Sequence, residues 1–155
     1  MAKEEFREIK AEVVVPYELA IGFTWARFYD ALKEETILGK KCRKCKRVFV
    51  PPRTFCPRCF EVMDEWVEVE HKGIVETWVL INMPFYGQQL EIPFVSAQIR
   101  LEGSDTGFTH RIGGFDLSDF DTVRQRVKLG SLVKAVWNKE KKGNILDIEY
   151  FEPVE

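Results

Sequence analysis

All four cysteines of this 155-residue chain lie in one short stretch, as two CxxC motifs separated by ten residues. The motifs are Cys42-Arg-Lys-Cys45 and Cys56-Pro-Arg-Cys59. A CxxC turn aims two thiolates to the same side, and a hairpin between two such turns can bring both pairs around one tetrahedral metal. We therefore predict Cys42, Cys45, Cys56 and Cys59 as metal ligands.

Two disulfides are the alternative use of these cysteines. Residues 1–6 lack the apolar core of a secretory signal, so we expect a cytoplasmic protein whose thiols stay reduced. Zinc suits four thiolates best, although iron in a rubredoxin-like site uses the same ligands. Since four protein ligands leave no position for water or substrate, we expect a structural metal that contributes on the order of 10 kcal/mol to folding.

Positive charge is concentrated around the cysteines. Residues 39–60 carry eight basic residues and no acidic one, which leaves 15 basic and 25 acidic residues, a net charge of −10, for the rest of the chain. A basic segment on an acidic body suggests an anionic partner, although solvated side chains on exposed turns would give the same pattern. No apolar run approaches the roughly 18 residues of a membrane helix.

Residues 1–37 are expected to form an arm followed by a helix. Thr24 is the predicted N-cap, and large apolar side chains recur at helical spacing up to about Glu35. These side chains are Trp25, Phe28, Tyr29 and Leu32. Such an aromatic stripe either packs on the rest of the protein or forms a docking surface or the wall of an acyl pocket.

Residues 38–62 are expected to form the metal-binding ribbon. A short strand is predicted at Val48-Phe49-Val50, and Pro51-Pro52 ends its pairing. We expect Val48, Val50 and Phe55 to cover the metal.

Residues 63–155 alternate apolar and polar positions, which indicates strands. The expected elements are one long strand or a bent pair over 66–81 with its break at 71–73, strands at 93–101, 107–112, 131–137 and 144–151, and a helical turn at 116–125 capped by Ser118. This order is typical of a five-stranded Greek-key barrel of the OB type.

The sequence lacks the pattern of a catalytic site. The cysteines are assigned to the metal, His71 and His110 lie in no catalytic pattern, and no phosphate-binding glycine motif occurs. The loop at 82–92 is unusually apolar, so we expect it either to cover a core edge or to meet a partner. Its apolar residues are Met83, Phe85, Tyr86 and Leu90.

The run Ile37–Phe60 resembles the DUF35 family. The resemblance lies in the Leu-Gly before the first CxxC motif and the Val-Pro-Pro-Arg before the second, and Lys128-Leu-Gly130 also fits. One departure is Lys46, where family members often carry glycine. The resemblance implies a mainly β protein with N-terminal helices, a rubredoxin-like zinc ribbon and a C-terminal OB-fold barrel.

The resemblance also implies a non-catalytic accessory or scaffold protein of acyl-CoA metabolism. Family members are found with thiolase-like enzymes, and in archaea one bridges acetoacetyl-CoA thiolase to hydroxymethylglutaryl-CoA synthase at the start of the mevalonate pathway. Expected partners are therefore these enzymes and coenzyme A esters. Arg53 is the first candidate for a phosphate contact, followed by Lys46 and Arg47.

Two other functions stay open. A zinc ribbon joined to an OB-fold could bind single-stranded nucleic acid through cations and stacking aromatics, although the acidic remainder of the chain opposes this. A rubredoxin-like electron carrier would need iron in place of zinc.

Overall fold

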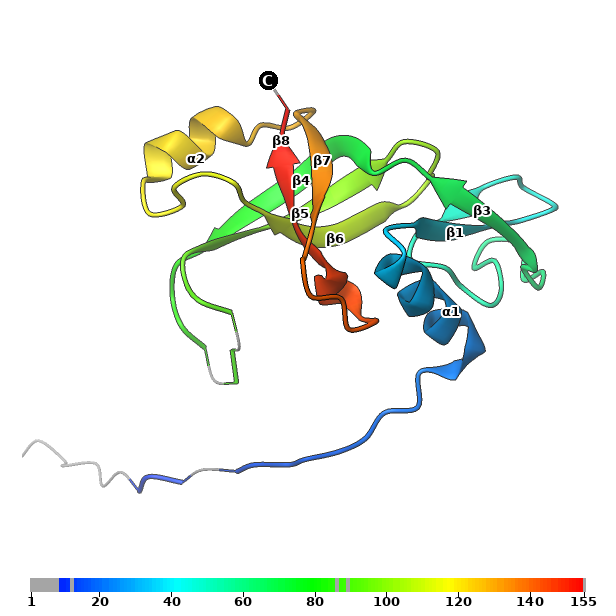
Figure 1. Ribbon diagram of the computed structural model, residues 1–155, viewed down its shortest axis with the longest axis horizontal. Coiled ribbons are helices and arrows are strands. Elements are labelled where there is room, and N and C mark those ends of the chain that lie inside the picture. Colours follow the sequence, from blue (N-terminus) through cyan, green and yellow to red (C-terminus); the bar gives the residue numbers. More distant parts are fainter. Residues whose placement is uncertain (1–8, 12, 86, 89, 155) are drawn as a thin grey trace, which may run out of the picture.

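The computed structural model describes residues 9–11, 13–85, 87–88 and 90–154 (Figure 1). A small three-stranded sheet and a barrel lie side by side, and the longer helix lies below the sheet in this view. The elements are α1 (Gly22–Lys33), β1 (Ile37–Lys41), β2 (Val48–Phe49), β3 (Glu65–Val69), β4 (Lys72–Ile81), β5 (Phe94–Leu101), β6 (Gly107–Ile112), α2 (Phe120–Arg126), β7 (Leu132–Trp137), the 3₁₀ turn η1 (Ile145–Asp147) and β8 (Ile148–Pro153). The predicted mainly β fold class is confirmed.

Helix α1 begins two residues before the predicted cap. Its N-cap is Ile21, which makes no side-chain capping bond, so the assignment of Thr24 as the cap was wrong. Gly22, at φ 67°, allows the extended arm to turn into the helix. Phe28 and Leu32 are completely buried, whereas Trp25 stays 37% exposed. Most of the aromatic stripe therefore packs on the core, and its outer end remains accessible.

The ribbon sheet has the strand order β2-β1-β3, with both pairings antiparallel. Strand β3 pairs with β1 from Ile37↔Val69 to Lys41↔Glu65, so the predicted bent pair over 66–81 is divided between two sheets. The break falls at residues 70–71, because β4 already begins at Lys72. The domain boundaries at 37/38 and 62/63 stay a prediction, although β3 extends the ribbon sheet to Val69.

The second part is a closed barrel with the strand order β4-β5-β6-β8-β7. Every second residue of β5 is buried, as the alternation predicted. Most side chains in the barrel interior are apolar. The buried apolar residues are Val75, Val95, Ala97, Ile99, Leu101, Phe108, Ile112, Val133, Ile148 and Phe151. Gly73 is required at the start of β4, because a Cβ atom there would lie 2.4 Å from the carbonyl oxygen of Arg100.

The connection between β5 and β6 joins the ribbon to the barrel. Val48 N–H donates to Asp105 Oδ2 (2.8 Å), and Asp105 N–H donates to the carbonyl of Val48 (2.9 Å). Two residues on, Val50 N–H donates to Thr106 Oγ1, which donates back to the Val50 carbonyl, both at 2.9 Å. The outer edge of β2 is therefore satisfied by the barrel, and the two parts share one apolar core.

One local prediction on the barrel, the cap of the second helix, was wrong, and the two roles expected for the loop at 82–92 can be compared with the exposure of its side chains. Helix α2 is capped by Asp119, whose carboxylate accepts from Asp121 N–H, and Ser118 lies before the cap. In the loop at 82–92, Met83 and Phe85 are 74% and 61% exposed, so these two side chains cover no core edge. Tyr86 lies outside the described residues. Neither helix in the described part of the chain is long and apolar enough to span a membrane.

Candidate metal centre

The two cysteine motifs fold into equivalent turns. In the first, Cys42 N–H donates to the carbonyl of Arg47 (2.9 Å) and Lys46 N–H donates to the carbonyl of Cys42 (2.8 Å). The second turn repeats both bonds from Cys56, each at 2.8 Å. Because each turn closes on its first cysteine, the two sulfurs of a motif lie on the same side of the backbone.

The structure brings the four predicted ligands together. Their Sγ atoms all lie within 4.8 Å of one another, and the Cys45 and Cys56 sulfurs, from different turns, are 3.8 Å apart. Four sulfurs at about 2.3 Å from a zinc ion would be about 3.8 Å apart in a tetrahedron. The four cysteines are free thiols, so the arrangement fits one tetrahedral metal and does not pair them as disulfides.

The thiols differ in how readily they ionise. Backbone N–H groups of Cys45 and Lys44 donate to Cys42 and lower its pKa to about 7, against the opposing effect of burial. Burial raises the pKa of Cys59 to about 12, and hydrogen bonds among the thiols act in the same direction. Since a metal takes thiolates, binding must displace the proton that Cys59 holds.

A small apolar cluster surrounds the sulfurs. Phe49 and Met63 are 5% and 1% exposed and pack with the cysteines, of which Cys42 and Cys56 are completely buried. The expectation that Val48, Val50 and Phe55 cover the metal was wrong. The two valines pack into the core shared with the barrel, because alternate residues of a strand face opposite sides, and Phe55 is 55% exposed.

Each cysteine turn contains one residue in the left-handed conformation. Lys46 has φ 64° and Phe60 has φ 57°, at matching positions directly after the second cysteine of each motif. A side chain at this backbone angle costs roughly 1 kcal/mol or more relative to glycine. This explains why glycine is favoured after such a motif, and it shows that Lys46 keeps the fold of the turn at a small energetic cost.

The basic residues of the ribbon fall into three groups. Lys40 is buried at 7% exposure, where its ammonium donates to the carbonyl of Met63 (2.8 Å) and lies 4.8 Å from the Trp66 ring, and burial lowers its pKa. Three others form ion pairs with acidic residues of 61–65: Lys41 with Glu65, Arg43 with Asp64 and Lys44 with Glu61. The rest have no ion-pair partner among the described residues, and they are Lys46, Arg47, Arg53 and Arg58.

Arg53 alone among the three predicted ligand contacts lines a cleft. The cleft has a volume of about 470 Å³ and lies between the start of α1 and residues 51–57. Its walls are mostly apolar and aromatic, formed by Trp25, Pro51, Pro52, Phe55 and Pro57, with Arg53 and Thr54 as polar members. Lys46 and Arg47 lie on the first cysteine turn and line none of the described cavities. The sequence alone does not reveal this cleft, because Trp25 and Pro51 are far apart in the chain.

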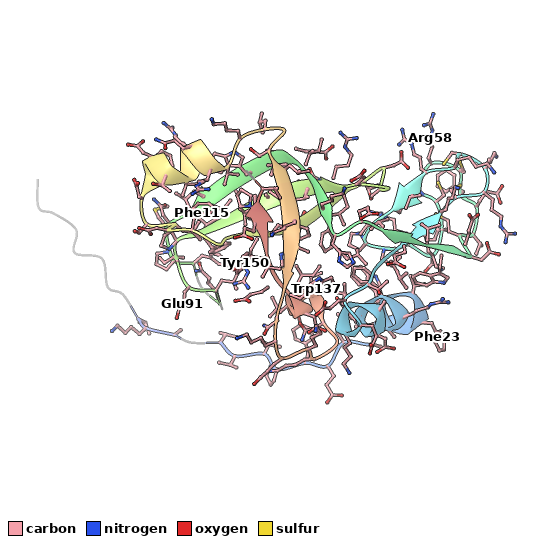
Figure 2. The ribbon with its side chains drawn as sticks, turned by 45° about the horizontal axis from the view of Figure 1, so that its top comes forward. Phe23, Arg58, Glu91, Phe115, Trp137 and Tyr150 are labelled. Carbon is pink, nitrogen blue, oxygen red and sulfur yellow. The ribbon has the colours of Figure 1, made fainter. Side chains whose placement is uncertain are left out.

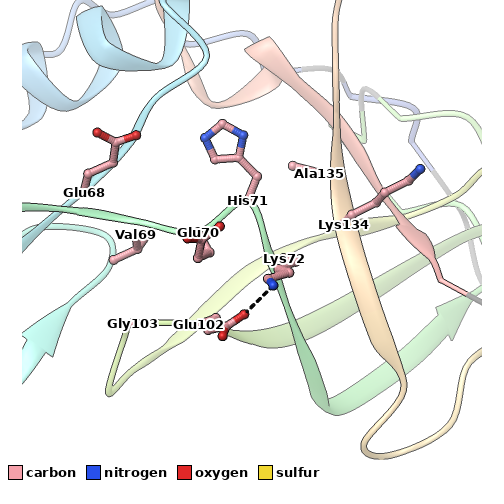
Figure 3. Close-up of a pocket in the computed structure, with 9 residues that line it drawn as sticks. All are labelled: Glu68, Val69, Glu70, His71, Lys72, Glu102, Gly103, Lys134 and Ala135. Carbon is pink, nitrogen blue, oxygen red and sulfur yellow. Dashed lines mark ion pairs between the residues drawn. The ribbon is translucent and has the colours of Figure 1, made fainter.

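A larger cavity of about 800 Å³ lies where β3 passes into β4 (Figure 3). Its lysines are already paired, Lys72 with Glu102 at 3.0 Å and Lys134 with Glu152 at 3.6 Å. The pKa of Lys72 is raised by its hydrogen bond to Glu102. His71 lines this cavity and packs edge-on against Trp137, so it serves as a packed residue.

The second histidine is part of the barrel core. His110 is 7% exposed, stacks on Phe108, and its Nε2 lies 3.2 Å from the carbonyl of Ile145. Its Nδ1 has no hydrogen-bond partner among the described residues. Burial lowers the pKa of His110, which favours the neutral imidazole.

Comparison with known families agrees with this architecture of a cysteine ribbon joined to an OB barrel. A family model described as "ChsH2, rubredoxin-like zinc ribbon domain" matches residues 30–62, and one described as "ChsH2, C-terminal OB-fold domain" matches residues 66–138. The chain belongs to the DUF35 family. The family resemblance seen in the sequence is confirmed.

Two curated relatives are similar at 27% identity. A "DUF35 domain-containing scaffold protein" from Methanocaldococcus jannaschii aligns over 135 residues, 83% of this chain and 90% of the relative. A "probable enoyl-CoA hydratase alpha subunit" from Thermomonospora curvata aligns over 111 residues, 72% of this chain. The aligned part is 34% of that second relative.

Two solved structures share the fold. A chain described as "Ltp2-ChsH2(DUF35) aldolase" aligns with a TM-score of 0.62 at 23% identity, covering 88% of this chain and 98% of that chain. A DUF35-family protein of unknown function from Sulfolobus solfataricus aligns with a TM-score of 0.54 at 29% identity, covering 71% and 75%. At these identities the first likeness establishes the fold alone.

Proposed function

We propose that this chain is a non-catalytic accessory or scaffold protein that binds thiolase-type enzymes. The observation that carries the proposal is the closed cysteine site. It is the one group of three or more potential metal ligands in the described residues, and four thiolates leave a tetrahedral metal no position for substrate. The names of two similar proteins, a scaffold protein and a member of an aldolase assembly, support a role beside an enzyme.

The partners we propose are acetoacetyl-CoA thiolase and hydroxymethylglutaryl-CoA synthase, which the chain would bridge in the mevalonate pathway. The cytoplasm is the proposed location, because four thiolates need a reducing compartment. The test is to mix the purified chain with both enzymes from the same source organism and measure molar mass by light scattering after gel filtration. A ternary complex is expected. If neither enzyme associates at micromolar concentrations, the proposal fails.

The proposed metal is zinc in a structural role. Elemental analysis of the purified protein should give one zinc per chain, and the protein should be colourless. An iron-containing, coloured protein with a reversible one-electron reduction would instead support the electron carrier.

We further propose that the Arg53 cleft binds a coenzyme A ester. Its support is the exposed Arg53 guanidinium at the edge of an apolar cleft, which has no ion-pair partner in the described part of the chain. Coenzyme A combines phosphates with an apolar acyl end. Calorimetric titration with acetyl-CoA should show weaker binding in Arg53→Ala. Arg43→Ala is the matched control, because that arginine is already paired with Asp64 at 3.0 Å. Lys46→Ala and Arg47→Ala test the two other candidates.

Nucleic-acid binding is the second candidate function. The observation that favours it is the presence of unpaired cations beside exposed phenylalanines on the ribbon, a combination that can hold phosphates and stack bases. Anisotropy of a labelled single-stranded RNA would detect it. Tight, salt-dependent binding together with no enzyme association would favour this candidate over the scaffold.

A further inference from the structure

We propose that the second cysteine turn and its flanks, residues 53–62, form the surface through which the chain docks onto its partner enzyme. We call this the outer ribbon surface and define it by Arg53, Phe55, Arg58, Phe60 and Val62. The inference rests on the proposed scaffold function and names the part of the chain that performs it. The partner it fits is a protein surface with an apolar centre and acidic side chains around it.

The first support is the exposure of large apolar side chains on one hairpin. Phe60, Val62 and Phe55 are 80%, 71% and 55% exposed, whereas Phe49 and Met63 on the inner side of the ribbon are buried. Phe55 and Val62 are paired directly opposite each other in an antiparallel bridge, so their side chains lie on the same face. Two neighbouring apolar side chains that the folded chain leaves in water are typical of a binding surface.

This apolar surface continues onto the helix. Phe55 and Arg53 also line the cleft of about 470 Å³ whose opposite wall includes Trp25 of α1. At the same junction the hydroxyl oxygens (Oγ1) of Thr24 and Thr54 are 3.4 Å apart, and this contact fixes the helix against the hairpin. Since the cleft itself is proposed to hold a coenzyme A ester, a partner docked on Phe55 would lie directly beside that ligand.

The distribution of charge on the ribbon also supports a docking surface at residues 53–62. Three other cations of the ribbon are already paired within the chain: Lys41 with Glu65, Arg43 with Asp64 and Lys44 with Glu61. Arg53 and Arg58 have no ion-pair partner among the described residues, and Figure 2 shows Arg58 at the upper edge of the ribbon in that view. The outer ribbon surface thus offers positive charge that a partner's carboxylates would complement.

The composition of this surface favours a protein over a nucleic acid. Interfaces with nucleic acids are strongly cationic and polar, whereas this hairpin exposes three large apolar side chains beside two unpaired arginines. Phenylalanine and arginine around an apolar centre are the composition of protein–protein contact sites. The acidic remainder of the chain, with its net charge of −10, would also repel a phosphate backbone that extended beyond the ribbon.

The experiment measures binding of the zinc-loaded full chain to purified acetoacetyl-CoA thiolase and, separately, to hydroxymethylglutaryl-CoA synthase by calorimetry. The test variant is Arg58→Glu with Phe60→Ser. The control is Lys128→Glu with Leu129→Ser, which makes the same charge change beside a similarly exposed apolar residue, 71% exposed, on the barrel. Since Arg58 lies between two ligands, Phe55→Ser with Val62→Ser is a second test variant outside the turn.

We expect each test variant to keep one zinc and to lose about tenfold or more in enzyme affinity, while the control changes about twofold or less. Added salt should weaken binding of the unmodified chain more than that of Arg58→Glu. Unchanged affinity in a zinc-loaded test variant overturns the inference and leaves the scaffold function standing. If the unmodified chain binds neither enzyme, the proposed function itself fails. If it binds a labelled RNA instead and the test variants lose that binding, the surface serves nucleic acid and the inference is overturned.

Discussion

The ribbon and the barrel are stabilised by different interactions. The barrel buries ten apolar side chains in its interior, whereas the apolar cluster around the ribbon's sulfurs contains two, Phe49 and Met63. Two buried side chains supply only a few kcal/mol, which does not offset the ordering of a ribbon of this length. The ribbon therefore depends on a metal, and the barrel depends on apolar burial.

The two parts are nevertheless joined by more than the backbone. The core that the two parts share includes Ile37, Val50 and Val69 from the ribbon and Phe28 from α1. The loop at 105–106 completes the edge of β2. Loss of the metal should therefore unfold the cysteine turns first and weaken the inner strands less.

The largest expected effect comes from the metal ligands. Cys59→Ser removes one of four thiolates, and we expect it to lose most of the metal's contribution to folding, which is on the order of 10 kcal/mol. Chelation of the zinc in the unmodified chain should do the same. Amide NMR spectra should then lose the dispersed signals of residues 42–62 and keep those of the barrel.

Cys59→His is the matched control, because a half-buried position has room for an imidazole and zinc accepts three cysteines with one histidine. This variant should retain one zinc and a folded ribbon. An unchanged ribbon spectrum in Cys59→Ser would contradict the assignment of the metal as the main stabiliser.

The next effect belongs to the barrel. Phe151 is completely buried and lies 6.1 Å, ring to ring, from Phe108 in an edge-to-face arrangement. Phe151→Ala should destabilise the zinc-loaded chain by about 3 to 5 kcal/mol, measured by denaturant unfolding. Phe60→Ala makes the same truncation on the ribbon, where the ring is 80% exposed, and should change stability little. Equal losses in both variants would show that exposure of Phe60 is not retained in solution.

A smaller effect tests the junction between the parts. Thr106 both accepts from Val50 N–H and donates to the Val50 carbonyl. Thr106→Val keeps the shape and removes both bonds, so we expect a loss of about 1 to 3 kcal/mol. Thr109→Val is the control. That threonine is exposed on β6 and lies opposite Gln98 of β5, and no hydrogen bond of its side chain is found among the described residues. A variant as stable as the control would mean that the backbone groups of Val50 find water instead.

The sequence predicted most of the fold because its signals are local. The spacing of the cysteines identified the ribbon, and the alternation along 93–101 and 107–112 identified β5 and β6 almost to the residue. The sequence did not predict the features that depend on tertiary contacts. The pairing of β3 with β1 could not be read from the sequence, because the alternation around Trp66 is equally suited to the barrel.

The same reasoning applies to the candidate site. All four cysteines were predicted correctly as one cluster, but the side chains that cover them were not, since the direction of each side chain of β2 depends on strand register. Arg53 was singled out as a ligand contact, yet its cleft with Trp25 exists only because α1 folds against residues 51–57.

A further effect depends on pH and concerns the barrel alone. Because burial lowers the pKa of His110 below its usual 6.5, the unfolded chain binds a proton more readily than the folded one. The stability that this neutral histidine contributes is present above about pH 6.5 and is lost as pH falls toward the lower folded pKa. His110→Gln can still donate to Ile145 and does not titrate. Its free energy of unfolding should therefore decline less steeply below pH 6.5 than that of the unmodified chain, with zinc saturating in both. Parallel curves would contradict the burial of His110.

The smallest expected change in stability concerns the left-handed residue of the first cysteine turn. Lys46 adopts φ 64° directly after the first CxxC motif, a backbone conformation that glycine adopts without strain. Lys46→Gly should therefore stabilise the zinc-loaded chain by up to about 1 kcal/mol, less the greater conformational entropy that glycine adds to the unfolded chain. Lys46→Ala is the control, because it removes the same charge and keeps a Cβ atom at the same backbone angle. Denaturant unfolding of both variants separates the two causes: a gain in the glycine variant alone comes from the backbone, whereas an equal gain in both would come from relief of repulsion among the ribbon's cations.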